Sequence, residues 1–158
     1  MIEEIKGDLL TSVADILCHQ TNYVGVMGAG IAYAIKTKLL TPEQHMEYQK
    51  YCQLHGAAAL GSVQFIHLSS GQYVANIFSQ DDFYSKRKDT ITDYSAMEKA
   101  LIEVDKFALA NRLTVAIPGY MGCGIAGGDW EKVRHIIRKV FRHSRTDCTI
   151  VYKEERTW

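Results

Sequence analysis

Hydrophobic and polar positions follow two different patterns along the chain, one typical of strands and one typical of helices. Compact apolar runs predict strands over residues 2–5, 15–20, 62–68, 72–78, 113–117 and 148–152. Apolar residues at helical spacing predict helices over residues 29–40, from Thr41 to about His55, from about Asp93 onward, and from Asp129 onward. Strands that alternate with helices predict a three-layer α/β/α domain with a central mixed sheet, whose ligand lies at the carboxyl ends of strands.

Local signals place several boundaries between these elements. Thr41-Pro42 supplies an N-cap and a first-turn proline for the second helix. Ser69-Ser70-Gly71 predicts a hairpin between the two strands that flank it. Thr92 or Asp93 is expected to cap the long third helix. The polar, aperiodic segment 79–92 predicts a surface loop, and loops of that length are often functional.

Composition and charge narrow the classes of function. The 158 residues are expected to form one domain over residues 1–158. Lys plus Arg equals Asp plus Glu, 18 against 18, so no net positive field would attract nucleic acid. No apolar run predicts a membrane span, and the acidic N-terminal segment does not resemble a signal peptide. Four scattered cysteines favour reduced thiols, so we expect a cytoplasmic protein, and its size favours a monomer.

Two glycine-rich segments carry the strongest functional signal. Three glycines within residues 25–30 stand between a predicted strand and a predicted helix. Because glycine lacks a Cβ, the backbone there can come within hydrogen-bonding distance of a ligand, and the amides at the helix start favour phosphate. A second segment, residues 118–128, has the same position between strand and helix. Two such loops on one domain suggest a diphosphate held between them.

The motifs together resemble those of the macrodomain family, the ADP-ribose-binding modules. They are Lys6-Gly7-Asp8-Leu9, His19-Gln20-Thr21-Asn22, and the segments 25–32 and 122–126. The first glycine cluster has the spacing GxxGxG without an acidic residue about 20 positions later, so it does not match a dinucleotide-binding Rossmann fold. The resemblance covers essentially the whole chain. It is strongest to the branch with terminal-type ADP-ribosyl glycohydrolases, DNA-directed bacterial antitoxin macrodomains and the yeast ADP-ribose 1''-phosphate phosphatase.

This resemblance implies a set of ligand contacts, with ADP-ribose or a derivative as partner and without cofactor or metal. Asp8 matches the aspartate that accepts a hydrogen bond from the adenine amino group, although a simple Gly-Asp turn would use the same residue. Asn22 matches an asparagine near the distal ribose. Tyr120 and Tyr152 are expected to wall the adenine or the distal ribose. The predicted ligand-binding residues are Asp8, Leu9, Asn22, Gly28, Ala29, Gly30, Ile31, Gln80, Tyr120, Gly122, Cys123, Gly124, Ile125, Ala126 and Tyr152.

The catalytic pair of the glycohydrolase members is replaced in this chain. Their lysine nucleophile aligns with Gln80 and their assisting aspartate with Ala126, which disfavours that covalent mechanism. Lys86 and Lys88 fall in the neighbouring polar loop, where a run of charges favours solvated side chains. Asp129 directly precedes a helix and is favoured as its N-cap.

His19 is the candidate catalytic residue. It ends a predicted strand and matches a histidine of the yeast phosphatase, where an imidazole can activate water or protonate a leaving ribose oxygen. The alternative is a core histidine with its hydrogen bonds satisfied. Cys123 is either a thiol of lowered pKa or a small residue packed under the diphosphate. Phe83 and Tyr84 are further aromatic candidates for the ligand wall, and the other histidines share no metal-binding spacing.

Three functions remain open on these residues. A hydrolase would act on ADP-ribose 1''-phosphate or on an ADP-ribosylated macromolecule and would use His19. A non-catalytic ADP-ribose reader is supported by Gln80 and Ala126, since the binding loops remain while the catalytic pair is lost. Nucleic-acid binding through Lys86-Arg87-Lys88 is disfavoured by the zero net charge.

Overall fold

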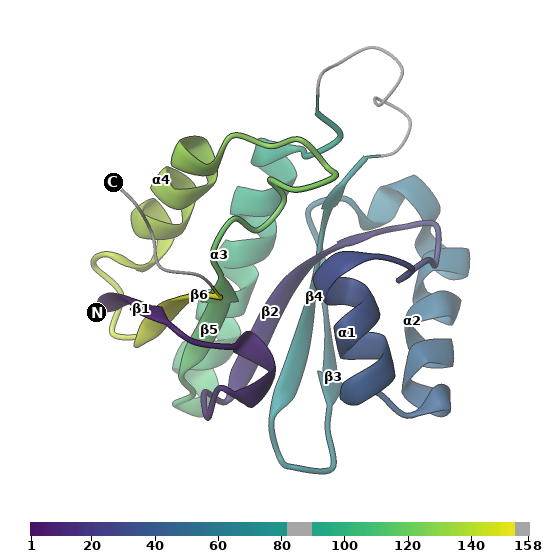
Figure 1. Ribbon diagram of the computed structural model, residues 1–158, viewed down its shortest axis with the longest axis horizontal. Helices are drawn as coiled ribbons and strands as arrows, with labels where there is room; N and C mark the ends of the chain where they lie inside the picture. Colours follow the sequence, from purple (N-terminus) through teal and green to yellow (C-terminus); the bar gives the residue numbers. More distant parts are fainter. Residues whose placement is uncertain (82–89, 154–158) are drawn as a thin grey trace.

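A single mixed sheet forms the centre of the protein, whose computed structural model describes residues 1–81 and 90–153. The six strands lie in the order β1-β6-β5-β2-β4-β3 (Figure 1). All neighbours are parallel except β3 and β4, which form the predicted antiparallel hairpin. The strands are β1 (Ile2–Lys6), β2 (Ile16–Asn22), β3 (Val63–His67), β4 (Tyr73–Gln80), β5 (Val115–Pro118) and β6 (Cys148–Tyr152).

Helices cover both faces of this sheet. α1 and α2 lie on one face, and α3 and α4 lie on the other (Figure 1). The helices are α1 (Gly30–Lys38), α2 (Pro42–His55), α3 (Tyr94–Asn111) and α4 (Trp130–Phe141), with short 3-10 turns η1 (Leu9–Thr11) and η2 (Gly56–Ala59). The predicted three-layer α/β/α architecture is confirmed.

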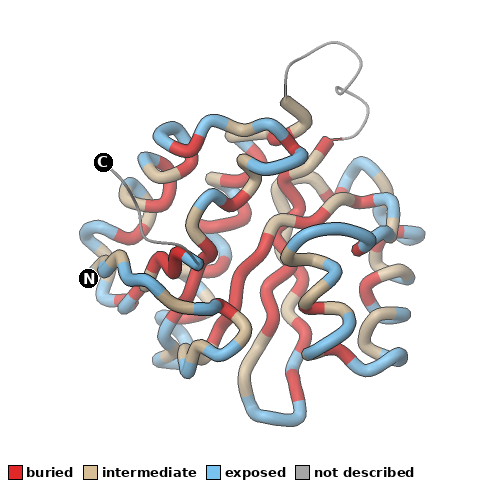
Figure 2. The backbone as a smooth tube through the Cα atoms, viewed as in Figure 1, coloured by how far each residue is buried: buried red, intermediate tan, exposed pale blue. Residues whose placement is uncertain are grey.

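β2 lies inside the sheet and contributes to the core on both of its faces. Ile16 and Cys18 pack with the side chains of α3 and α4, whereas Leu17 packs with those of α1 and α2. This alternation follows from the two-residue period of a strand. Figure 2 shows the strands largely buried and the outer faces of the helices exposed. The carboxyl end of β2 at Asn22 therefore emerges between the two helical layers.

Among the α-helices of residues 1–81 and 90–153, α2, α3 and α4 begin with a side-chain cap. Thr41 and Gln44 form a reciprocal capping box at the start of α2. Asp93 accepts from the backbone N–H of Ala96 at 2.9 Å, so it is Asp93, and not Thr92, that caps α3. The N-cap interpretation of Asp129 is also confirmed, because its carboxylate accepts from a backbone N–H of α4. α1 differs from the other three, since its N-cap residue has no hydrogen-bonding side chain.

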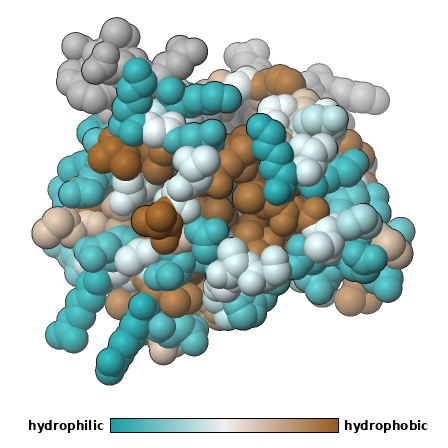
Figure 3. Space-filling model, turned by 60° about the horizontal axis from the view of Figure 1, so that its bottom comes forward, coloured by the Kyte–Doolittle hydropathy of each residue, from teal (hydrophilic) through white to brown (hydrophobic). Residues whose placement is uncertain are grey.

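The surface mixes polar and apolar side chains. In Figure 3 the apolar side chains gather near the middle of one face and polar side chains surround them. Partly buried residues such as Leu10, Ala14 and Ile31 adjoin the core. Across residues 1–81 and 90–153, none of the helices has the length and apolar character needed to cross a bilayer.

Candidate functional site

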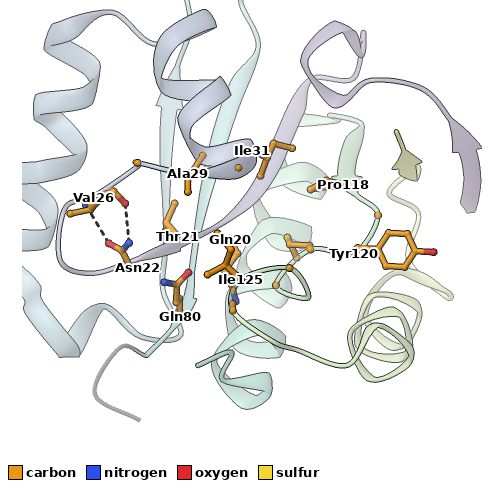
Figure 4. A pocket seen from close by; sticks show the side chains of 18 residues that line it. Gln20, Thr21, Asn22, Val26, Ala29, Ile31, Gln80, Pro118, Tyr120 and Ile125 are labelled. Atoms are coloured by element: carbon orange, nitrogen blue, oxygen red, sulfur yellow. Dashed lines mark hydrogen bonds between the residues drawn. The ribbon is translucent and has the colours of Figure 1, made fainter. Parts of the chain in front are cut away.

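A cavity of about 480 Å³ opens at the carboxyl ends of β2, β4 and β5. The loop from β2 to α1 forms one wall, and the loop that follows β5 forms the other (Figure 4). The two glycine-rich segments, far apart in the sequence, therefore face each other across one space. The lining residues are Gln20, Thr21, Asn22, Val26, Gly28, Ala29, Gly30, Ile31, Ala32, Gln80, Pro118, Gly119, Tyr120, Met121, Gly122, Gly124, Ile125 and Ala126.

Asn22 fixes the shape of the first wall. Its Oδ1 accepts from the backbone N–H of Val24 at 3.1 Å and from the Tyr48 hydroxyl at 2.9 Å. Its Nδ2 donates to the carbonyl oxygen of Val26 at 2.9 Å, as Figure 4 shows. A carboxamide carries two N–H donors, so one remains beyond the bond to Val26, on a residue that lines the cavity.

The first turn of α1 presents backbone amides to the same space. Ala29 occupies the N-cap position and has no side chain that could accept from these N–H groups. Gly30, the first helical residue, adopts a φ of +59°, which glycine reaches without strain. Unpaired amides and the positive end of the helix dipole make this position suited to an anion such as a phosphate.

The second wall is tied to the segment of residues 90–92. The Thr92 hydroxyl donates to the carbonyl oxygen of Gly122 at 2.7 Å. The Thr90 hydroxyl and the backbone N–H of Ile91 both donate to the carbonyl oxygen of Ala126, at 2.7 and 3.0 Å. These bonds hold the glycine-rich loop at both of its ends.

Gln20 stabilises this loop through Thr92, the residue that binds Gly122. Its Nε2 donates to the Ser79 hydroxyl at 3.0 Å and to the Thr92 hydroxyl at 3.2 Å. A Cβ at Gly122 would lie 3.0 Å from that nitrogen and 3.1 Å from the Thr92 hydroxyl oxygen. Gly122 also has a φ of +75°. Glycine is therefore required here by both space and backbone conformation.

Aromatic rings close the far end of the second wall. Tyr120 is about half exposed, lines the cavity and adopts a φ of 63°, a left-handed conformation uncommon for a tyrosine. Its ring lies 5.2 Å from that of Trp130 and 5.6 Å from that of Tyr152, between ring centres. Tyr152 is buried behind Gly119, and its hydroxyl donates to Glu4 at 2.5 Å. Tyr120 is therefore the ring of this trio that a ligand can reach.

No family model matches the chain, but individual proteins do. A DNA ADP-ribosyl glycohydrolase of Mycobacterium tuberculosis is 28% identical over 155 residues, which cover 96% of this chain and 42% of that relative. An ADP-ribose 1''-phosphate phosphatase of Meyerozyma guilliermondii is 28% identical, with 85% of this chain and 91% of the relative covered. The chain thus spans less than half the length of the mycobacterial relative.

Solved structures with the same fold decide the family. The macrodomain of Mycobacterium tuberculosis DarG superposes with a TM-score of 0.81 at 26% identity, covering 98% of this chain and 99% of that chain. A Bacteroides thetaiotaomicron protein of unknown function gives a TM-score of 0.83 at 30% identity, covering 96% and 98%. The chain belongs to the macrodomain family.

Most of the ligand-binding residues predicted for this macrodomain line the cavity. They are Asn22, Gly28, Ala29, Gly30, Ile31, Gln80, Tyr120, Gly122, Gly124, Ile125 and Ala126. Their gathering at one site agrees with the prediction that the two loops face each other, and their contacts with ADP-ribose remain a prediction.

Asp8, Leu9 and Tyr152 do not line this cavity. Asp8 is exposed and caps η1, where its Oδ1 accepts from the backbone N–H of Leu10 at 3.0 Å. The Leu9 side chain is buried in the core, which leaves its backbone for any ligand contact. Tyr152 supports Gly119 and stands behind the wall. The predicted contact between Asp8 and adenine remains a prediction.

Cys123 also lies behind the wall, and its thiol is not activated. Burial, followed by the charge of Asp129, raises the pKa of Cys123 to about 12. Its Sγ donates to the carbonyl oxygen of Met121 at 3.4 Å. The interpretation of Cys123 as a small packed residue is therefore favoured over the reactive thiol.

The structure does not support His19 as a catalytic residue. The side chain is completely buried and is not among the lining residues of the cavity. Nε2 lies 2.6 Å from Oδ1 of Asn76, and the Asn76 amide donates to Gln64. Because an amide oxygen only accepts, the hydrogen bond to Asn76 requires a proton on Nε2. Burial lowers the pKa of His19 to about 4, partly offset by the Asn76 hydrogen bond, so the ring is neutral near pH 7. The geometry fits the alternative of a core histidine in part: Nε2 is satisfied, whereas the buried Nδ1 has no partner among the described residues.

The buried His19 is expected to make stability depend on pH. Its pKa is about 4 when folded and about 6.5 when unfolded, so the unfolded chain takes up the proton first as pH falls. The neutral histidine therefore contributes fully to the free energy of unfolding above about pH 6.5. This contribution decreases as the pH falls towards 4, by about 3 kcal/mol at most. Urea unfolding between about pH 4.5 and 7.5 measures it. His45, whose pKa is lowered by burial and by Lys36, adds in the same direction, so His45→Gln is the matched control. The slope should persist in His45→Gln and flatten in His19→Gln.

The two positions that align with the catalytic lysine and aspartate of the glycohydrolases belong to the same cavity. Gln80 and Ala126 both line it. Among the lining residues that the structure describes, Tyr120 carries the only titratable side chain. The described part of the chain contains no group of three or more His, Cys, Asp or Glu residues placed to hold a metal ion. The candidates Phe83, Tyr84, Lys86 and Lys88 lie outside the described residues.

Several lining residues were not predicted from the sequence. They are Gln20, Thr21, Val26, Ala32, Pro118, Gly119 and Met121. Gln20 and Thr21 belong to the motif that ends at Asn22, and the others lie within the segments 25–32 and 118–128. The motifs therefore contained these positions, and only the selection of individual residues left them out.

Proposed function

We propose that this macrodomain binds ADP-ribose and hydrolyses an ADP-ribose derivative. The observation that carries the proposal is the pair of glycine-rich loops that face each other across the cavity, with the uncapped amides of α1 at one wall. These amides suit a diphosphate. The exposed ring of Tyr120 supplies an apolar surface at one end, and the carboxamides of Asn22 and Gln80 supply polar groups for ribose hydroxyls.

The proposed substrates are ADP-ribose 1''-phosphate and ADP-ribosylated macromolecules. The first is named by the similarity to the fungal phosphatase, and the second by the similarity to the mycobacterial glycohydrolase. Because the chain corresponds to 42% of that glycohydrolase, the DNA-linked substrate is the more distant inference. Four free cysteines support action in a reducing compartment, the cytoplasm, and we propose that the protein acts there as a monomer.

Catalysis in this cavity would rest on positioning and on amide donors. Gln80 and Ala126 cannot supply the lysine nucleophile and the aspartate of the glycohydrolases. Backbone amides at the start of α1 can stabilise negative charge that develops on phosphate oxygens, and rigid loops hold the bond to be broken in one place. The scarcity of titratable side chains among the described lining residues favours a second candidate function, a reader that binds ADP-ribose without turnover.

Calorimetric titration with ADP-ribose, and with AMP as control, tests the binding. We expect a dissociation constant on the order of micromolar for ADP-ribose and much weaker binding of AMP. Incubation with ADP-ribose 1''-phosphate, followed by chromatography of ADP-ribose and phosphate, then separates enzyme from reader. Tight binding without product would establish the reader. No binding of either nucleotide would refute the proposed function while leaving the fold intact.

A further inference from the structure

Thr21 carries a buried hydroxyl without a hydrogen-bond partner among the described residues. The residue is 3% exposed and is the penultimate residue of β2. A hydroxyl removed from water without a replacement partner destabilises the folded state. Threonine therefore requires a reason at a position where valine would have the same shape and no unpaired group.

The position of Thr21 supplies that reason. The residue lines the cavity between Gln20 and Asn22. Figure 4 shows its side chain rising from β2 towards Ala29, which is the N-cap residue of α1. Thr21 and the first residues of α1 thus line the same cavity. Among residues 1–81 and 90–153, the Thr21 hydroxyl has no hydrogen-bond partner and the start of α1 has no side-chain cap, and a single anionic group could satisfy both.

We propose that the Thr21 hydroxyl donates a hydrogen bond to a phosphate oxygen of the bound diphosphate. The proposal rests on the function proposed above and adds a residue to its ligand contacts. A hydroxyl donates well to a charged oxygen, and such bonds are stronger than those between neutral groups. Thr21 joins the α1 amides in holding the phosphate, so ligand binding removes the desolvation penalty that the unliganded protein carries.

Thr21→Val is expected to move stability and affinity in opposite directions. Without ligand, the variant loses only an unsatisfied hydroxyl, so its melting temperature should rise by roughly 3 °C. With ligand, the variant lacks one hydrogen bond to a charged group, so affinity for ADP-ribose should fall about tenfold. A purely structural role for the side chain predicts a lower melting temperature and no such opposition.

Two matched variants isolate the hydroxyl. Thr21→Ser keeps the donor and should retain affinity within about threefold. Thr146 is equally buried, but its hydroxyl donates to Asp105 at 2.7 Å and lies outside the cavity. Thr146→Val should therefore lower the melting temperature, opposite to Thr21→Val, and leave ADP-ribose affinity unchanged.

Calorimetric titration of each variant with ADP-ribose and with ADP identifies the group that Thr21 contacts. An equal loss of affinity for the two ligands supports the phosphate contact, because ADP has the diphosphate without the distal ribose. A loss confined to ADP-ribose would assign the hydroxyl to the ribose and overturn the proposal, as would unchanged affinity or a lower melting temperature for Thr21→Val. If the wild-type protein binds neither ligand, the proposed function fails together with this inference, whereas normal wild-type binding with an unaffected Thr21→Val refutes this inference alone.

Discussion

Gly119→Ala is expected to lower the free energy of unfolding by about 3 kcal/mol and to displace the second wall of the cavity. An added Cβ would lie 2.3 Å from Cδ1 and 2.6 Å from Cε1 of the Tyr152 ring. That ring cannot move aside easily, because it is buried and its hydroxyl donates to Glu4, which also pairs with Arg134 at 2.6 Å. Urea unfolding measures the change in stability. Titration with ADP-ribose measures the change in affinity that the displaced wall should cause.

Gly7→Ala is the matched control for this prediction. Its added Cβ would meet a single methyl group, Cγ1 of Val151, at 3.3 Å, so a loss below about 1 kcal/mol is expected. The double variant Gly119→Ala/Tyr152→Leu should be less destabilised than the sum of its single changes, since the second change removes the obstructing ring. Full stability of Gly119→Ala would show that the ring does not confine this loop.

Gly124→Val is expected to reduce ADP-ribose affinity at least about a hundredfold while leaving thermal stability nearly unchanged. Gly124 lines the cavity, and an added Cβ would meet no atom of the described residues within 4 Å beyond its two neighbours in the chain. The new side chain would therefore fill space that the protein leaves to the ligand. Calorimetry measures the affinity for ADP-ribose, and a thermal melt on the same preparation measures the stability.

Gly122→Val separates this effect from a structural one. A Cβ at Gly122 would lie within 3.2 Å of three side-chain atoms, and its φ of +75° strains any branched residue. Stability and affinity should therefore both fall in Gly122→Val. Retained affinity in Gly124→Val would mean that the ligand does not approach the second loop at this point.

The fold and the walls of the cavity could be predicted because they follow from local patterns. Apolar runs and helical spacing located each strand and α-helix of the described residues, with errors at the ends; β4, for example, continues to Gln80. They did not locate the short 3-10 turns η1 and η2. Glycine clusters between a strand and a helix located both walls, because glycine marks places where a backbone must approach something closely. Asp129 was recognisable as a cap because it directly precedes the helix.

The role of His19 could not be predicted in the same way, because it depends on depth within the sheet. The sequence predicted that β2 ends at Gln20, which would place His19 at the rim. The strand continues to Asn22 and pairs His19 with Asn76 of β4, inside the sheet. A difference of two residues in the end of the strand therefore determines whether the His19 side chain lies at the cavity or in the core. Its partner Asn76 lies far along the chain, so no local sequence pattern predicts the hydrogen bond.

The pairing of β1 with β6 has a consequence for how the protein is made. In the sheet that the described residues form, β1 pairs with β6 alone, and their register runs from Ile2 with Cys148 to Lys6 with Tyr152. A ribosome that adds roughly 5–20 residues per second leaves β1 without a neighbour for about ten seconds or longer. The edge of β5 that pairs with β6 stays open for a much shorter time, because β5 (Val115–Pro118) is itself added late in the chain. Nascent chains should thus be most dependent on chaperones just before β6 emerges, and a stop codon upstream of Cys148 should yield a product prone to aggregation.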